Sequence, residues 1–166
     1  MEYRTLPHGG ERIGVIGMGS SVIGARPESE IIGTVRAAVE LGVNCFDMAG
    51  GHAAIFGAYG KALQDLRDRV YLQVHFGADY TSGEYGWTTD LEGVKRSVDW
   101  QLRNLKTNYI DSALSTVSMR PRLITYEKNG VLDISARDEA QRCRASSGPF
   151  LAHSGAGRGN AGPEVH

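Results

Sequence analysis

The chain has 166 residues, enough for one domain with a hydrophobic core and too few for two ordinary domains. Its net charge of −1 gives no electrostatic reason to expect nucleic acid or an anionic membrane as a partner. The first residues carry no apolar signal segment, and no apolar run approaches the roughly 18 residues that cross a bilayer. Two cysteines, Cys45 and Cys143, form neither a metal motif nor a disulfide framework, so we expect a cytoplasmic protein.

The first part of the chain predicts alternating strands and helices. Arg12–Gly19 is a short apolar run rich in Ile, Val and Gly, which is typical of a buried strand. Residues 29–42 predict a helix that Gly42 is placed to end. Three apolar residues share one face of this helix: Ile31, Val35 and Val39. Val43–Met48 then predicts a second strand.

The same alternation continues as far as residue 111. Residues 58–66 predict a helix, and Val70–Val74 predicts a third strand. Residues 89–107 have the clearest helical pattern, and Thr89 with Glu92 forms a capping-box signature at its start. Five apolar residues repeat there at helical spacing: Leu91, Val94, Val98, Leu102 and Leu105. Tyr109–Asp111 opens another strand.

Buried strands that alternate with helices predict parallel β-α-β units. Two architectures use that pattern, a doubly wound sheet and a (β/α)8 barrel. Gly17-Met18-Gly19 follows the first strand and suggests a dinucleotide-binding fingerprint. The fingerprint needs a third glycine where Val22 stands, and a helix that opens at once, whereas residues 25–30 intervene. We therefore interpret these glycines as a tight strand end.

Several phrases, taken in order, resemble the aldo/keto reductase family. The stretch "EYRTLPHGGERIGVIGMGS" is similar to the family's N-terminal hairpin and first barrel strand, and "AAVELGVNCFDMA" to its second strand. The phrases "YGKAL", "RDRVYLQVHFGA" and "SVDWQLRNLKTNYID" resemble the next helix, third strand, long helix and fourth strand. The ordered set favours an α/β fold, the N-terminal half of a (β/α)8 TIM barrel with an N-terminal β-hairpin. We expect this partial barrel over residues 1–133 and an irregular tail over 134–166.

The resemblance implies NAD(P)H-dependent reduction of a small carbonyl substrate by residues at the C-terminal ends of barrel strands. In the family a Tyr donates the proton, an Asp–Lys pair lowers its pKa, and a His orients the carbonyl. Asp47 matches the family Asp, His52 stands in place of the Tyr, and His75 stands in place of the Lys. The family His falls near Thr116.

His52 and His75 each have a catalytic and an ordinary interpretation. His52 can serve as a proton donor, because an imidazolium can play that role, or it is a plain polar loop residue. His75 can hold a charge beside Asp47, since an adjacent carboxylate favours imidazolium. The phrase "HFG" around His75 also resembles an iron–sulfur-associated branch of the family, although two isolated cysteines cannot hold a four-thiolate cluster. Tyr80 and Tyr85, on the next loop, are candidates for substrate contact.

The pattern breaks down after residue 111, and we consider two explanations. Codons that can encode Ser112–Arg120, read two bases later, give Gly-Phe-Ile-His-Cys-Leu-Asp-Glu, which resembles the family's fourth strand. A second slip at Arg142–Ser146 gives Gly-Val-Val-Arg-His, which resembles the approach to the next strand. These matches favour frame disruption over residues 112–125 and 134–166. The alternative is a natural chain whose tail has diverged and is disordered.

Three functions follow from these features. The first is a truncated reductase, inactive as this chain because about 250 residues are typical of a whole barrel. The second is a non-catalytic half-barrel that forms a homodimer through its open edges and buries an apolar barrel interior. The third is a dinucleotide-binding module built on Gly17–Gly19.

Overall fold

The computed structural model describes residues 1–7, 10–115 and 128. The chain opens with an antiparallel hairpin of β1 (Tyr3–Thr5) and β2 (Arg12–Gly14). It continues through β3 (Met18–Gly19), the short helix η1 (Ser21–Ile23), α1 (Glu28–Glu40), β4 (Cys45–Met48), α2 (Ala54–Leu63) and the short helix η2 (Arg67–Arg69). The remaining elements are β5 (Tyr71–Phe76), β6 (Ala78–Asp79), β7 (Gly86–Trp87), α3 (Leu91–Asn104) and β8 (Ser112–Ser115).

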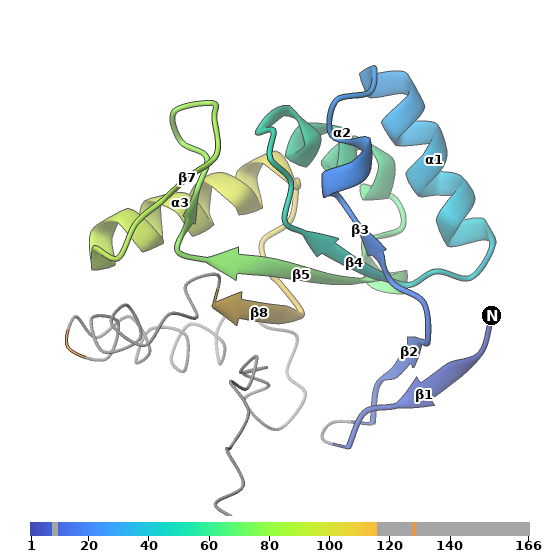
Figure 1. The fold of residues 1–166 in the computed structure, drawn as a ribbon. Helices are drawn as coiled ribbons and strands as arrows, with labels where there is room; N and C mark the ends of the chain where they lie inside the picture. The colour runs from blue at the N-terminus through green and yellow to red at the C-terminus, as the bar shows by residue number, and fades with distance from the viewer. Residues whose placement is uncertain (8–9, 116–127, 129–166) are drawn as a thin grey trace, which may run out of the picture.

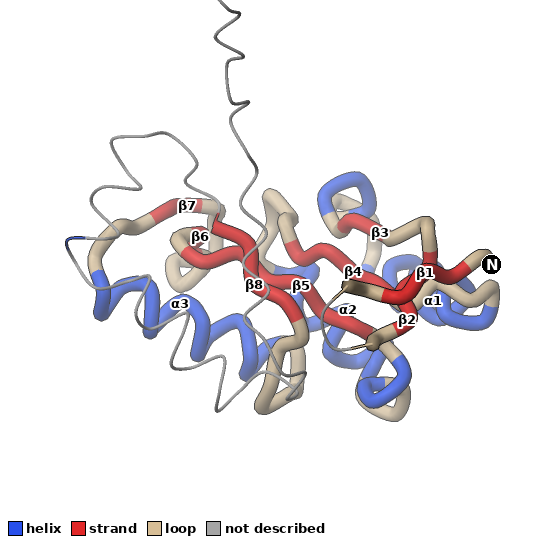
Figure 2. The backbone as a smooth tube through the Cα atoms, turned by 90° about the horizontal axis from the view of Figure 1, so that it is seen from below, coloured by secondary structure: helices blue, strands red, loops and turns tan. Residues whose placement is uncertain are grey.

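Four parallel strands form the main sheet in the order β3-β4-β5-β8, which is also their order along the chain. Figure 1 shows α1, α2 and α3 on one side of this sheet, and Figure 2 shows its strands side by side from below. A doubly wound sheet reverses its strand order part-way across, whereas a (β/α)8 barrel adds each strand beside the last. The topology therefore has the winding of a barrel, as expected, over the part that the structure describes.

The core lies between the helices and one face of the sheet. Phe46, Met48, Leu72 and Val74 alternate along β4 and β5 and are fully buried there. The helices contribute residues at the spacings that the sequence predicts: Ile31, Val35 and Val39 from α1, and Val94, Val98 and Leu102 from α3. Burial of these side chains is the main force that holds the layers together.

The opposite face of the sheet, which becomes the interior of a closed barrel, is largely polar. Asp47, Gln73 and Ser112 are neighbours in register across β4, β5 and β8, and His75 follows two residues along β5. The sequence-based expectation of an apolar barrel interior therefore fails at these four positions, although Tyr71 and Leu114 lie on the same face. The reason is the two-residue period of a strand, which directs Leu72 and Val74 to the helices and Gln73 and His75 away from them.

The run Arg12–Gly19 is not one buried strand. Its first three residues belong to the hairpin, where Val15 N–H donates to Glu2 O at 3.0 Å, and its last two pair with β4. Ile16, between them, is 61% exposed. The chain bends at Val15 and Ile16, and Gly17 then lies against Cys45, where the β-carbon of any other residue would meet the Cys45 carbonyl oxygen at 3.3 Å.

Three further boundaries differ from the sequence prediction. The helix expected over 58–66 begins earlier, at Ala54. The fourth strand forms at Ser112–Ser115 rather than Tyr109–Asp111, because Asp111 N–H bonds to Leu72 O and brings the following residues alongside β5. Helix α3 is capped by Asp90, whose Oδ2 accepts from Gly93 N–H at 2.8 Å, and not by a Thr89–Glu92 capping box.

Gly42 ends α1 as predicted, with a φ of +91° that favours glycine. A side chain there would also overlap Tyr3, whose hydroxyl donates to Gly42 O at 2.9 Å. The tail expected over 134–166 and the Thr116 position lie outside the described residues. No helix in the described ranges is long and apolar enough to cross a membrane.

Candidate active site

Asp47 and His75 meet at the C-terminal ends of two neighbouring parallel strands. Asp47 is the third residue of β4, and His75 is the fifth residue of β5. His75 Nε2 lies 2.7 Å from Asp47 Oδ1, within hydrogen-bond distance. The His75 side chain is 10% exposed, whereas that of Asp47 is 40% exposed. This edge of a parallel sheet is where barrel and other α/β enzymes place their functional groups.

Gln73 brings a second donor to the same carboxylate oxygen. Its Nε2 donates to Asp47 Oδ1 at 3.1 Å, and its Oε1 accepts from Ser112 Oγ at 3.3 Å. Burial by itself raises the pKa of Asp47, but the hydrogen bonds from His75 and Gln73 and the charge of His75 outweigh it. The net effect lowers the pKa of Asp47, so its carboxylate stays ionised to a lower pH than usual.

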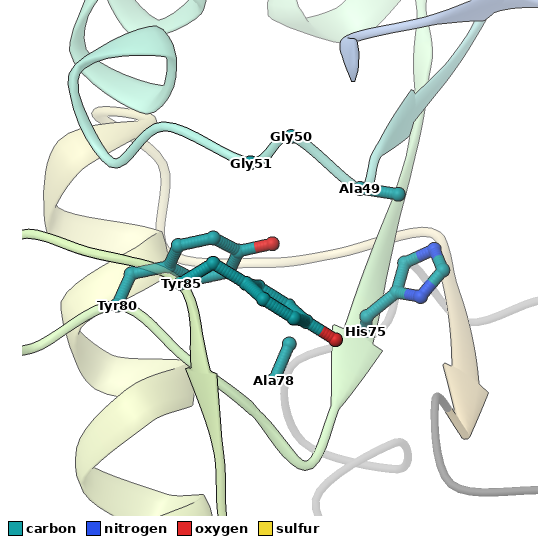
Figure 3. A pocket seen from close by; sticks show the side chains of 7 residues that line it. All are labelled: Ala49, Gly50, Gly51, His75, Ala78, Tyr80 and Tyr85. Carbon is teal, nitrogen blue, oxygen red and sulfur yellow. The ribbon is translucent and has the colours of Figure 1, made fainter.

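A pocket of about 190 Å³ opens beside His75. It is lined by the Ala49, Gly50 and Gly51 segment after β4, and by His75, Ala78, Tyr80 and Tyr85. Figure 3 shows both tyrosine rings directed from the β5–α3 connection into the space between His75 and the Gly50–Gly51 backbone. The lining thus combines small residues, two phenols and one imidazole, which suits a small organic molecule with a polar group.

Tyr80 is the rigid wall of this pocket. It is 1% exposed, stacks on Trp100 with a centroid distance of 5.9 Å, and packs on Phe56 at 4.7 Å. Burial, and secondarily the charges of Tyr85 and Asp47, raise the pKa of Tyr80 to about 12, so its phenol stays protonated at neutral pH. The sequence places Tyr80 and Tyr85 as candidate substrate contacts, and the structure brings both to the pocket.

Two buried polar residues of α3 bond to the backbone of β5 and β6, and sequence reasoning missed both. Gln101 Nε2 lies 3.4 Å from the His75 carbonyl oxygen, and Ser97 Oγ donates to the carbonyl oxygen of Ala78. Both residues are fully buried. Their place on the apolar face of α3, beside Val94, Val98 and Leu102, is the signal that could have found them.

His52 lies apart from the other two predicted residues. Its backbone forms an isolated bridge with Glu84, its residue is exposed, and it is not among the residues that line the pocket. A β-carbon on Gly24 would lie 3.3 Å from His52 Cδ2, which places the ring against the loop after η1. The structure therefore joins Asp47 to His75 and leaves His52 on the far side of its loop.

The residues at this site offer little to the pyrophosphate of a dinucleotide. The lining of the pocket includes no Lys or Arg that could meet a phosphate. Gly17–Gly19 leads into η1, a single turn, and α1 begins only at Glu28. Val22, where the fingerprint needs glycine, is 91% exposed. In the described part of the chain, therefore, neither the pocket nor the glycine segment supplies a pyrophosphate site.

Comparison with known proteins decides the family. A model of the aldo/keto reductase family matches residues 15–116, which is more than half of the chain. The chain belongs to the aldo/keto reductase family. It is 31% identical over 120 residues to L-galactose dehydrogenase from Arabidopsis thaliana, a match that covers 67% of this chain and 36% of that protein. The matched residues include Asp47, His52 and His75.

Solved structures of aldo/keto reductases share the fold. The holo form of AKR11C1 from Bacillus halodurans superposes with a TM-score of 0.63 at 20% identity, over 87% of this chain and 55% of that chain. A Klebsiella pneumoniae aldo/keto reductase in complex with NADP and acetate superposes with a TM-score of 0.56 at 22% identity, over 77% of this chain and 46% of that chain. The chain thus spans about half the length of these structures and about a third of the curated relative.

Proposed function

We propose that residues 1–115 carry the carbonyl-binding half of an NADP(H)-linked aldo/keto reductase site, with Asp47, His52 and His75 as its catalytic residues. The observation that carries the proposal is the 2.7 Å contact between His75 Nε2 and Asp47 Oδ1. The contact joins the two family positions that hold an Asp and a Lys in the resemblance, at the edge of the sheet that bears the pocket. A His paired with a carboxylate can donate a hydrogen bond to a carbonyl oxygen and polarise it.

His52 can donate a proton at the pocket only if its loop moves. Its ring lies against Gly24, so the 50–53 loop must turn it toward His75 before it can donate a proton at the pocket. Substitution of His52 by Ala separates the two interpretations of this residue. A proton donor would lose about 10²-fold or more in turnover, whereas a loop residue would lose little.

Activity also needs a part of the fold that residues 1–115 do not contain. The described strands make half of an eight-stranded barrel, and the lining of the pocket includes no Lys or Arg for the phosphates of NADP(H). We therefore place cofactor binding outside these residues, and we expect no carbonyl reduction by this half alone. Whether the gene itself supplies the rest is tested by re-reading its DNA across codons 111–145.

A chimera tests the proposal directly. Residues 1–115 are joined to the second half of the Klebsiella pneumoniae reductase, and oxidation of NADPH is followed with a panel of small aldehydes and ketones. We expect carbonyl-dependent oxidation that falls by about 10²-fold or more in Asp47→Asn and in His75→Ala. Asp65→Asn is the matched control, because Asp65 pairs with Arg36 on the surface. The proposal is contradicted if the chimera folds and binds NADPH but does not oxidise it with any carbonyl compound of the panel. It is also contradicted if Asp47→Asn leaves the rate of oxidation unchanged.

The non-catalytic half-barrel is less well supported. Strands β3 and β8 are the edges of the described sheet, as that idea requires. The face that a second copy would cover, however, carries Asp47, Gln73 and His75, and burying these groups costs free energy unless each finds a partner. Tyr71 and Leu114 offer this face only limited apolar surface to offset that cost.

A further inference from the structure

The inner face of the sheet carries a row of polar side chains that crosses three strands. Gln73 stands between Asp47 on β4 and Ser112 on β8 in the strand register. Direct neighbours in a sheet lie close enough for their side chains to interact. Because a shift by one residue would turn Gln73 to the helix side, the same register that buries Leu72 and Val74 also fixes this row.

The hydrogen bonds in the row set the orientation of the Gln73 amide. Ser112 Oγ donates to Gln73 Oε1 at 3.3 Å, which leaves Nε2 to donate to Asp47 Oδ1 at 3.1 Å. The reversed amide would face the carboxylate with its oxygen, where two acceptors repel each other. The Asp47 carboxylate, which can only accept, therefore selects this amide orientation, and the Ser112 hydroxyl adapts to it by donating to Oε1.

The Asp47 carboxylate needs such support, because burial alone does not hold it. Its side chain is 40% exposed, while the imidazole that it meets is nearly buried. His75 and Gln73 both bond to Oδ1, so that oxygen is held from two directions on β5. A carboxylate with only one of these partners can rotate toward solvent.

We propose that Gln73, anchored by its hydrogen bond to Ser112, is a positioning residue that holds the Asp47 carboxylate against His75. For its catalytic meaning this inference rests on the proposed function, since it assigns Gln73 a role in the same site. Gln73 acts on the site through its hydrogen bond to Asp47, and Ser112 acts through Gln73, so both are positioning residues and not catalytic ones. The role also requires strand β8, which begins at the residue where the family pattern was expected to fail.

Other titratable groups surround Asp47 and must be separated from Gln73 in any test. His75 faces it from β5, Cys45 lies on β4, Tyr59 on α2, and Tyr80 on the β5–α3 connection. Burial, and then the charge of Asp47, raise the pKa of the Cys45 thiol and of the Tyr59 phenol. Cys45, Tyr59 and Tyr80 titrate well above the acidic range of Asp47, so they keep one charge state while Asp47 is titrated.

The test is a carbon-13 NMR titration of the Asp47 side-chain carboxyl in the full chain, between pH 2 and 7. We compare the unsubstituted chain with Gln73→Leu, Gln73→Glu and Ser112→Ala, and with Gln64→Leu as the matched control on an exposed amide. We expect the Asp47 midpoint to rise in Gln73→Leu, to rise further in Gln73→Glu because of like-charge repulsion, and to rise least in Ser112→Ala. An unchanged midpoint in both Gln73 variants, with preserved amide spectra, overturns the proposal.

A double-substitution cycle distinguishes a positioning residue from an independent donor. If Gln73 acts by holding the carboxylate against His75, the shifts from Gln73→Leu and His75→Gln are not additive in the double variant. Additive shifts would mean that each donor acts alone, which also overturns the proposal. Neither measurement uses substrate or cofactor, so a failure here is distinct from a failure of the chimera to reduce a carbonyl.

Discussion

Asp47 shows how much a single residue contributes to this site. It receives His75 and Gln73 on one oxygen, lies at the end of a strand, and is half-exposed toward the inner face of the sheet. The hydrogen bonds from His75 and Gln73 favour the ionised form of Asp47, and this carboxylate is in turn the hydrogen-bond partner of His75. The catalytic hypothesis therefore depends on the charge of one carboxylate, and that charge has a measurable effect on stability.

We expect Asp47 to stabilise the fold at neutral pH and not at acidic pH. Its pKa is lower in the folded chain than in the unfolded chain, so its contribution is present above the unfolded value and is lost as the pH falls through the folded value. Asp47→Asn should lower the free energy of unfolding at pH 7, by about 1 kcal/mol or less because the group is half-exposed, and change it little at pH 2. Urea unfolding at both pH values checks this, and an equal loss at both would contradict it.

A second carboxylate, Asp111, should matter more for stability. Its Oδ2 lies 2.6 Å from Arg67 Nη2, and both side chains are nearly buried, at 4% and 11% exposure. Asp111→Asn leaves the Arg67 charge buried without its counter-ion, so we expect a loss of about 3–5 kcal/mol in chemical denaturation. Asp65→Asn, which removes an exposed partner of Arg36, should cost far less, because water screens that ion pair. Similar losses of unfolding free energy in Asp111→Asn and Asp65→Asn would show that the buried ion pair stabilises the chain no more than the exposed one.

At the scale of elements, α3 ties the site to the rest of the fold. Its apolar face packs on the sheet, and Gln101 and Ser97 reach the backbone of β5 and β6. Helix α2 in turn contacts the end of α3 so closely at Gly60 that a methyl group there would overlap the carbonyl oxygen of Asn104. Placement of His75 therefore depends on how α3 begins and on how it meets α2.

The start of α3 depends on Asp90. Replacement of this N-cap by Ala removes the bond to Gly93 N–H, and we expect a loss of about 1 kcal/mol in the free energy of unfolding. Glu92→Ala should cost only about 0.2–0.5 kcal/mol, because Glu92 pairs with Lys95 on the surface and does not cap the helix. Thermal unfolding of both variants decides which residue is the cap, and a larger effect for Glu92→Ala would restore the capping box.

Two glycines of α2 give a matched pair of substitutions. Gly60→Ala should destabilise the chain by about 1–3 kcal/mol, because the added methyl group meets the backbone of Asn104 and Leu105. Gly57→Ala has nothing within 4 Å of its new methyl group, so the higher helix propensity of Ala should stabilise the chain by about 0.5–1 kcal/mol. If urea unfolding shows that Gly60→Ala lowers the free energy of unfolding and Gly57→Ala raises it, the close contact of α2 and α3 is confirmed. Equal changes in the two variants would exclude it.

At the scale of the whole molecule, the described strands form half of a barrel whose inner face is polar. The edges of that sheet are β3 and β8, and the pocket lies at the C-terminal ends of β4 and β5. Under the proposed function, such a half-site would hold a carbonyl compound without holding the cofactor. This separates two binding events that a complete member of the family performs together.

We therefore expect NADP to leave the melting temperature of this chain unchanged. A ligand at about 100-fold above its dissociation constant stabilises its protein by about 2.7 kcal/mol, which a thermal scan detects as a rise of several degrees. The Klebsiella pneumoniae reductase, whose structure contains NADP, serves as the positive control. A rise for this chain would place a phosphate site in residues that the structure does not describe.

Part of the fold could be predicted because local patterns and burial agree. Residues Ile31, Val35 and Val39 repeat at helical spacing and are buried together, and Gly42 ends the helix with a positive φ. The bend after Gly14 could not be predicted, because the apolar residues of 12–19 have the same pattern whether they form one strand or parts of two strands. The Thr89 signature failed because the helix begins one residue later, with Asp90 as its N-cap and Gly93 N–H as the donor to that cap.

Asp47 and His75 were predicted from their place in family phrases, and their meeting depends on a strand register that no local pattern specifies. Gln73 escaped attention for the same reason, since an isolated polar residue in an apolar strand has no assigned neighbour until the strands are paired.

By itself, the sequence determined the strand-helix alternation, the family and the positions of the candidate catalytic residues, because these depend on spacing along the chain. Only the tertiary structure decided that His75 meets Asp47, that His52 lies against Gly24, and that Gln73 and Ser112 extend the row across β8. These contacts join residues 26 to 39 positions apart. Their geometry comes from the parallel pairing of strands and the packing of α3 on the sheet, which are properties of the folded chain as a whole.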